Sequence, residues 1–192
     1  MVLDTALFNL INGSAGRVAV VDSLMRLLVN DYFLPTALCL LTAALWFAGS
    51  SKQERGRNQR VIVSIIMAVL LANVVVKLCN LVFFRPRPFS VQQVNLLFYR
   101  PSDSSLPANS AAVAFAFAGV AWQRHRWLGV VMGALAGLFA IARIYCGVHY
   151  PLDLVAGGLV GSVSAYLVGK SQRALEPLMA AVIGVARRLY LA

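Results

Sequence analysis

The sequence has few charged residues for its length. Asp, Glu, Lys and Arg make up 12% of its 192 residues, whereas 60% of the residues are hydrophobic. A soluble globular domain carries about twice that share of charge, so the composition excludes this class of protein. It predicts instead a polytopic membrane protein built from helices.

Acidic residues are especially scarce, with 7 Asp and Glu against 17 Lys and Arg and a net charge of +10. In a soluble protein this excess would suggest nucleic-acid binding, but no recognised nucleic-acid motif is present. The basic residues lie in short loops between apolar runs, where membrane topology and anionic lipids explain them. We therefore expect membrane lipids and no nucleic acid as partners, and the oligomeric state stays open.

Histidine and cysteine are also rare. The chain has 2 histidines and 3 cysteines, and Cys39, Cys79 and Cys146 are too few and too widely spaced for a disulfide framework or a zinc site. We expect no metal and no other cofactor. The first residues, Met-Val-Leu-Asp, carry no basic segment, so we expect no cleaved signal peptide.

Apolar runs predict an all-α membrane helix bundle with about five transmembrane spans. The runs cover residues 33–48, 61–84, 108–122, 127–141 and 152–168. We expect one domain over 1–192 with its transmembrane core at 31–170. Residues 1–30 are predicted to form interfacial helices, or alternatively the polar beginning of the first span. Residues 171–192 are predicted to form an amphipathic interfacial helix.

The charge of the loops predicts the topology. The loops at 50–60, 123–126 and 170–173 are basic, and the positive-inside rule assigns such loops to the cytoplasm. The loops at 85–107 and 143–151 would then face the other side of the cell membrane. This arrangement brings five candidate residues to one extracytoplasmic surface: Arg85, Arg87, Arg143, His149 and Asp153.

His149 and Asp153 are the strongest catalytic candidates. Pro151 predicts that a helix begins between them, so the carboxylate can reach back to one imidazole nitrogen. That contact would fix the tautomer and leave the other nitrogen free to attack. Arg143 offers a planar fork of donors that suits phosphate oxygens. The alternative is that His149 merely lies at a membrane interface and Asp153 caps a helix.

Two further patterns lie inside predicted spans. Asn73, Lys77 and Asn80 share one helical face, which favours a position facing the bundle interior. Alternatively, Lys77 reaches the headgroups by snorkelling. Glycines at 129, 133 and 137 recur every four residues and predict a close helix contact.

Three blocks together carry a resemblance to a known family. They are Arg85-Pro-Arg-Pro-Phe89 after a helix bearing a lysine, residues 105–110 (Ser-Leu-Pro-Ala-Asn-Ser), and Arg143-x5-His149-x3-Asp153. In order and spacing they resemble the three signatures of the type-2 phosphatidic-acid phosphatase superfamily of integral membrane lipid phosphatases. The segments 7–12 and 22–25 resemble its undecaprenyl-diphosphate phosphatase branch.

The resemblance implies that His149 is the nucleophile that takes up the phosphoryl group and that Asp153 orients it. It implies that Arg87 and Arg143 hold the phosphoryl oxygens, and it implies no metal. Further candidates for phosphate binding at the matching positions are Lys77, Arg85, Asn109 and Ser110. The first block departs from the family because Lys77 lies one residue too far from Arg85.

The second block departs from the family at its general acid, a histidine where this chain has Ser110. Serine is a poor acid, and losing a positioned acid costs about two to four orders of magnitude in rate. A departing phosphate monoester has a pKa of about 6 and needs a proton less than an alkoxide does. The departure therefore favours a polyprenyl (undecaprenyl) diphosphate as substrate. The alternatives are another lipid phosphate, such as phosphatidate or phosphatidylglycerol phosphate, and a catalytically impaired lipid-phosphate binder.

Overall fold

The computed structural model describes residues 2–189, which form helices and loops without a strand. The helices are α1 (Val2–Asn12), α2 (Ala19–Val29), α3 (Phe33–Phe47), α4 (Lys52–Val82), α5 (Pro88–Val91), α6 (Asn109–Arg124), α7 (Arg126–Tyr145), α8 (Pro151–Lys170) and α9 (Gln172–Arg188). The all-α prediction is confirmed for the described residues.

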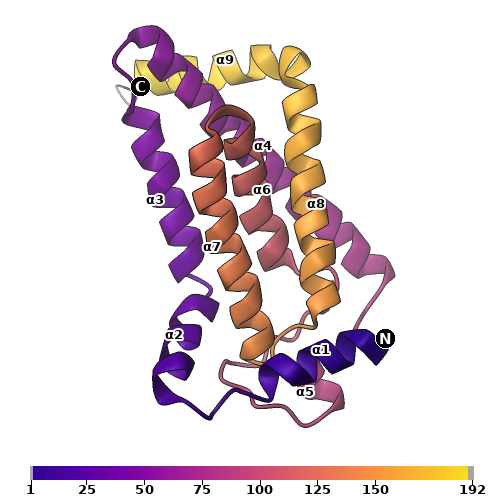
Figure 1. The fold of residues 1–192 in the computed structure, drawn as a ribbon. Helices are drawn as coiled ribbons and strands as arrows, with labels where there is room; N and C mark the ends of the chain where they lie inside the picture. The colour runs from indigo at the N-terminus through magenta and orange to yellow at the C-terminus, as the bar shows by residue number, and fades with distance from the viewer. Residues whose placement is uncertain (1, 190–192) are drawn as a thin grey trace.

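The middle of the bundle is α6, against which α4, α7 and α8 all pack (Figure 1). Small residues allow this arrangement. A Cβ atom added at Gly157 would lie 2.2 Å from the carbonyl oxygen of Ala108, and one at Gly161 would lie 2.1 Å from that of Ala112. The backbones of α6 and α8 are therefore in direct contact, which holds the start of α6 against the first turns of α8.

The close contact predicted for the glycines of α7 occurs at only one of them. A Cβ atom at Gly129 would lie 2.4 Å from Cα of Trp122, across the tight turn between α6 and α7. At Gly133 and Gly137, no atom of the described chain would lie within 4 Å of an added Cβ. The four-residue repeat therefore predicted a packed face that is open at two of its three positions.

Three described helices, α4, α7 and α8, are long and apolar enough to cross a membrane. The pair α2 and α3 passes the same test together but is bent by 57°, which makes three or four candidate spans. The predicted count of about five is not confirmed. The reason is that α6 has 16 residues and is therefore roughly 24 Å long. This is shorter than the hydrocarbon core of a bilayer, which is about 30 Å thick.

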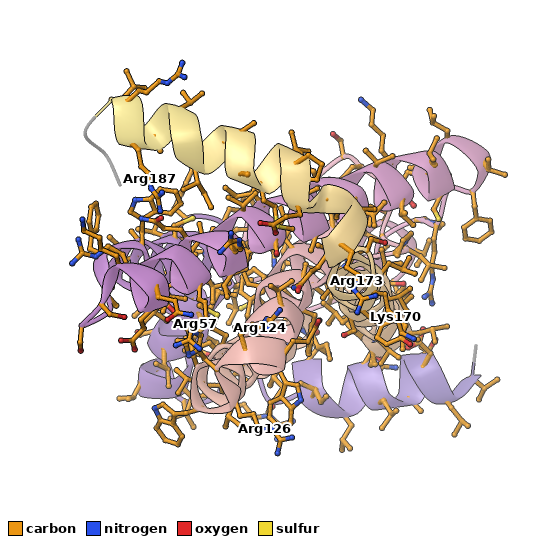
Figure 2. All side chains as sticks on the ribbon, turned by 90° about the horizontal axis from the view of Figure 1, so that it is seen from above. Arg57, Arg124, Arg126, Lys170, Arg173 and Arg187 are labelled. Atoms are coloured by element: carbon orange, nitrogen blue, oxygen red, sulfur yellow. The ribbon has the colours of Figure 1, made fainter. Side chains whose placement is uncertain are left out.

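The two ends of the bundle differ in charge. At one end α9 lies across the bundle, and at the other end lie α1, α5 and the turn between α7 and α8 (Figure 1). Figure 2 looks onto the α9 end and shows its basic side chains, among them Arg57, Arg124, Arg126, Lys170, Arg173 and Arg187. Met179 and Ile183 of α9 pack against Val63 of α4. The assignment of α1, α2 and α9 to the membrane interface stays a prediction.

Candidate active site

A cavity of about 270 Å³ lies at the end opposite α9, between the start of α3, the start of α6 and the end of α7. Its polar wall contains Asp31, Arg87, Tyr99, Asp103, Asn109, Ser110, Arg143 and His149. Its apolar wall includes Leu34, Leu38, Val113, Ala114 and Phe139. The cavity thus joins ionic groups to a hydrocarbon surface, as a lipid phosphate requires.

His149 lies in the turn between α7 and α8 and is 2% exposed. Its Nδ1 is 3.1 Å from the carbonyl oxygen of Ser105, which can only accept, so Nδ1 carries the proton. Nε2 is then the unprotonated nitrogen, and it accepts a hydrogen bond from Nη1 of Arg87 at 2.9 Å. Burial, aided by the charge of Arg87, lowers the pKa of His149 to about 4 against the opposing effect of Asp153. Near neutral pH the imidazole is therefore uncharged, with a lone pair on Nε2.

Asp153 acts on His149 mainly through Ser105. Its Oδ2 lies 3.8 Å from Nδ1 of His149, too far for a hydrogen bond. The same oxygen accepts hydrogen bonds from Oγ of Ser105 at 2.5 Å and from the backbone N–H of Tyr150 at 2.9 Å. Oγ of Ser105 is 3.3 Å from Nδ1 of His149. Sequence reasoning expected the carboxylate itself to hold the imidazole and missed this hydroxyl.

Arg85 supports Asp153 and does not line the cavity. Its Nη1 donates to Asp153 at 2.5 Å and its Nη2 donates to Asp4 at 2.6 Å. The other oxygen of Asp4 accepts from the backbone N–H of Leu152 at 2.8 Å, which ties α1 to the first turn of α8. Since two carboxylates occupy its guanidinium, the phosphate-binding role predicted for Arg85 does not fit its position. The sequence feature that could have indicated a role for Asp4 is that it is a single carboxylate in an otherwise apolar segment.

Arg87 and Arg143 both line the cavity, and each is paired with a carboxylate. Nη2 of Arg87 lies 2.8 Å from Oδ1 of Asp103, and the guanidinium of Arg143 is paired with Asp31. Both arginines are buried, whereas the Asp103 side chain is 61% exposed. Sequence reasoning missed the two aspartates, because nothing in the order of residues says that they meet these arginines.

Two buried polar atoms on the cavity wall lack a hydrogen-bond partner among the described residues. They are Nε of Arg143 and Oγ of Ser110. Leaving such groups unpaired is costly, so two of them on one cavity indicate a site for a polar ligand. Asn109 and Ser110 are also the first residues of α6, where the helix dipole favours an anion. The wall is suited to phosphate oxygens.

The structure brings together five of the predicted site residues on this cavity: Arg87, Asn109, Ser110, Arg143 and His149. Asp153 lies directly behind them, but Lys77 does not reach the cavity. Lys77 is exposed on α4, which fits the alternative that its side chain extends toward the headgroups. Among the described residues, no group of three or more His, Cys, Asp and Glu side chains could hold a metal ion.

Comparison with known proteins identifies the family. Residues 61–176 match the model of the PAP2 superfamily. The chain belongs to this superfamily. This confirms the resemblance of the three blocks, and the protein is a multi-pass membrane member of a lipid phosphatase family.

Individual relatives cover most of this PAP2 protein. It is 31% identical to YbjG of Escherichia coli (strain K12) over 171 residues, which are 86% of this chain and 82% of the relative. It is 28% identical to undecaprenyl-diphosphatase BcrC of Bacillus subtilis (strain 168) over 182 residues, 93% of this chain and 89% of BcrC. The crystal structure of Aquifex aeolicus LpxE superposes with a TM-score of 0.66 at 30% identity, covering 88% of this chain and 95% of LpxE.

Proposed function

We propose that this protein hydrolyses a polyprenyl diphosphate of the undecaprenyl class to the monophosphate and phosphate, with His149 as the nucleophile. The observation that carries the proposal is the hydrogen bonding of His149. Its Nδ1 is held by the carbonyl of Ser105, and its Nε2 lies on the cavity beside Arg87. A neutral imidazole whose unprotonated Nε2 lies among cationic donors is the arrangement that attack on phosphorus needs.

The reaction then takes two displacements at phosphorus. Nε2 of His149 attacks the terminal phosphorus, so an N–P bond forms while the bridging P–O bond breaks, and its electron pair leaves with the polyprenyl monophosphate. Arg87 transfers its hydrogen bond from Nε2 to a phosphoryl oxygen, where it stabilises the charge of the transition state. Water next attacks the phosphorus, the N–P bond breaks and returns its electron pair to Nε2, and both protons of the water leave with the released phosphate, so the neutral imidazole is restored.

Substrate binding must open two ion pairs. The terminal phosphate competes with Asp103 for Arg87 and with Asp31 for Arg143. Asp103 is largely exposed and can move into solvent, so Arg87 is the easier of the two to free. Arg143 already offers its unpaired Nε. The carboxylates thus neutralise the arginines before substrate binds, and they repel the phosphate less once they have moved away.

The position of Ser110 supports a diphosphate over a phosphate monoester. Its hydroxyl lines the cavity without a partner, so it can bond to a phosphate oxygen, but it is a poor proton donor. A departing polyprenyl monophosphate, with a pKa of about 6, leaves without strong acid catalysis. The similarity to undecaprenyl-diphosphatase BcrC points to the same substrate class. The apolar wall around Leu34 and Leu38 provides a surface for the first isoprene units.

The site is proposed to face the extracytoplasmic side of the cell membrane. The α9 end carries the basic loops, and the positive-inside rule places that end in the cytoplasm (Figure 2). A cysteine introduced at position 102 should therefore react with an impermeant reagent from outside, and one introduced at position 57 should not. Labelling of position 102 from the cytoplasmic side alone would contradict this orientation.

Phosphate release from three lipids tests the proposed substrate. Undecaprenyl diphosphate, phosphatidate and phosphatidylglycerol phosphate would be presented in the same detergent, to the wild type and to His149→Gln as the blank. We expect the highest kcat/KM for the diphosphate, because only its leaving group departs without an acid. A higher value for either monoester would contradict the proposal.

A further inference from the structure

The α9 end of the bundle contains another cavity, which is separated from His149 by the length of the bundle. Its volume is about 340 Å³, and it is lined by Lys52, Arg55 and Gln59 of α4 and by Arg187 of α9. Arg187 lies against the first turns of α4, since a Cβ atom at Gly56 would be 3.7 Å from its Nη2. Figure 2 shows Arg187 near the end of α9. Two helices thus bring three cations to one cavity.

Within residues 2–189, these three cations form no ion pair. The two acidic residues of this end are engaged elsewhere. Glu54 accepts from the backbone N–H of Ser50 at 3.0 Å, and Glu176 is paired with Arg60 at 2.8 Å. The start of α4 adds the positive end of a 31-residue helix. The cavity therefore has an excess of positive charge and suits an anion.

Gln59 gives independent evidence for a ligand. Its side chain is 1% exposed, and its Oε1 is buried without a hydrogen-bond partner among the described residues. Leaving a buried amide oxygen unpaired is costly, so Gln59 indicates a polar partner at this cavity. The amide can accept from a headgroup hydroxyl, or rotate to offer its NH₂ to a phosphate oxygen.

An apolar groove is built on the same two helices as the basic cavity. It has a volume of about 470 Å³, and Ala186, which precedes Arg187 in the chain, lines it. Ile62 and Ile66 line it and follow Gln59 by three and seven residues, so all three lie on one face of α4. The other wall comes mainly from α3, through Cys39, Thr42, Ala43, Trp46 and Phe47.

We propose that the basic cavity and the apolar groove together bind an anionic glycerophospholipid. Its phosphate would contact Lys52, Arg55, Arg187 and Gln59, and one acyl chain would lie along the groove between α3 and α4. The distance along α4 from Arg55 to Ile66 is roughly 16 Å, which accommodates a headgroup and much of a chain. The bound lipid would connect α4 to α9 and α3 and stabilise this end of the bundle, independently of catalysis.

Thermal unfolding of the purified full chain in a neutral detergent tests the proposal. Phosphatidylglycerol is titrated in, with phosphatidylcholine as the uncharged control, and the rise in midpoint gives the half-saturating lipid concentration. Arg187→Gln should raise that concentration about fivefold, since one cation near an anionic lipid contributes about 1 kcal/mol. Arg173→Gln is the matched control, because Arg173 is exposed on α9 and lies outside the cavity.

Two further measurements test the apolar groove and the phosphate contacts independently. Ala43→Phe fills the exposed groove without changing charge and should also weaken stabilisation by phosphatidylglycerol. Glycerol 3-phosphate, which carries the phosphate but no chain, should stabilise far less than the lipid. Equal weakening in Arg187→Gln and Arg173→Gln would overturn the proposal in favour of bulk attraction. Equal stabilisation by glycerol 3-phosphate, or by phosphatidylcholine, would overturn it as well.

Discussion

Replacing His149 with asparagine should flatten the dependence of folding stability on pH. Burial lowers the pKa of His149 to about 4 in the folded protein, against 6.5 for an ordinary histidine. As the pH falls below 6.5, the unfolded chain takes up a proton that the folded protein does not, so the folded state loses stability. The loss begins near pH 6.5 and reaches about 3 kcal/mol at pH 4. His149→Asn lacks this contribution.

The assay is unfolding in mild detergent, followed by the fluorescence of the three tryptophans, at pH values from 7.5 down to 4. The difference between the wild type and His149→Asn isolates one group, because the carboxylates titrate in both proteins. His125→Asn, at the other end of the bundle, is the matched control for losing a histidine. If the stabilities of wild type and His149→Asn fell in parallel with pH, the argument for a neutral, buried imidazole would be refuted.

Three further predictions concern the cavity and its support. Ser110→His should raise kcat/KM up to about a hundredfold for phosphatidate and much less for a polyprenyl diphosphate; equal gains would contradict the leaving-group argument. Asp103→Asn should lower KM about two- to fivefold with little change in kcat, because Arg87 is freed; an unchanged or higher KM would count against this competition. Gly161→Ala should cost about 1–3 kcal/mol of stability in thermal unfolding, because its Cβ meets Ala112; Gly133→Ala is the matched control, and equal losses would refute the close packing.

Hydropathy and loop charge predicted where the helices lie in the sequence, but they did not predict which helix faces pack together. The helices occur near the predicted apolar runs because apolar residues and backbone hydrogen bonding leave few other choices in a membrane. The number of spans could not be predicted, since α6 is apolar and short but lies at the centre of the bundle. The close helix contact lies at Gly157 and Gly161, while the more regular glycine repeat on α7 is largely open. Which face of a helix packs depends on its partner, and one sequence does not identify that partner.

The candidate site was likewise predictable only in part. The basic loops at 50–60, 123–126 and 170–173 predicted that Arg87, Arg143 and His149 would meet at the opposite end, and they line one cavity. Residues that hold these side chains from a distance in the chain were not predictable. Ser105 meets His149 where the loop before α6 lies against the start of α8, and Asp4 supports Arg85 from near the N-terminus. Their roles follow from three-dimensional contacts that no local spacing encodes.

Trapping of a phosphoenzyme tests whether His149 is the nucleophile. The purified protein would be mixed with undecaprenyl diphosphate labelled in its terminal phosphate, quenched in alkali within milliseconds and digested for mass spectrometry. Alkali preserves a phosphorus–nitrogen bond, so a covalent intermediate would survive. We predict label on Nε2 of His149 that decays as free phosphate appears, and no label in His149→Gln. Turnover without label on residue 149, or label on another residue, would contradict the account.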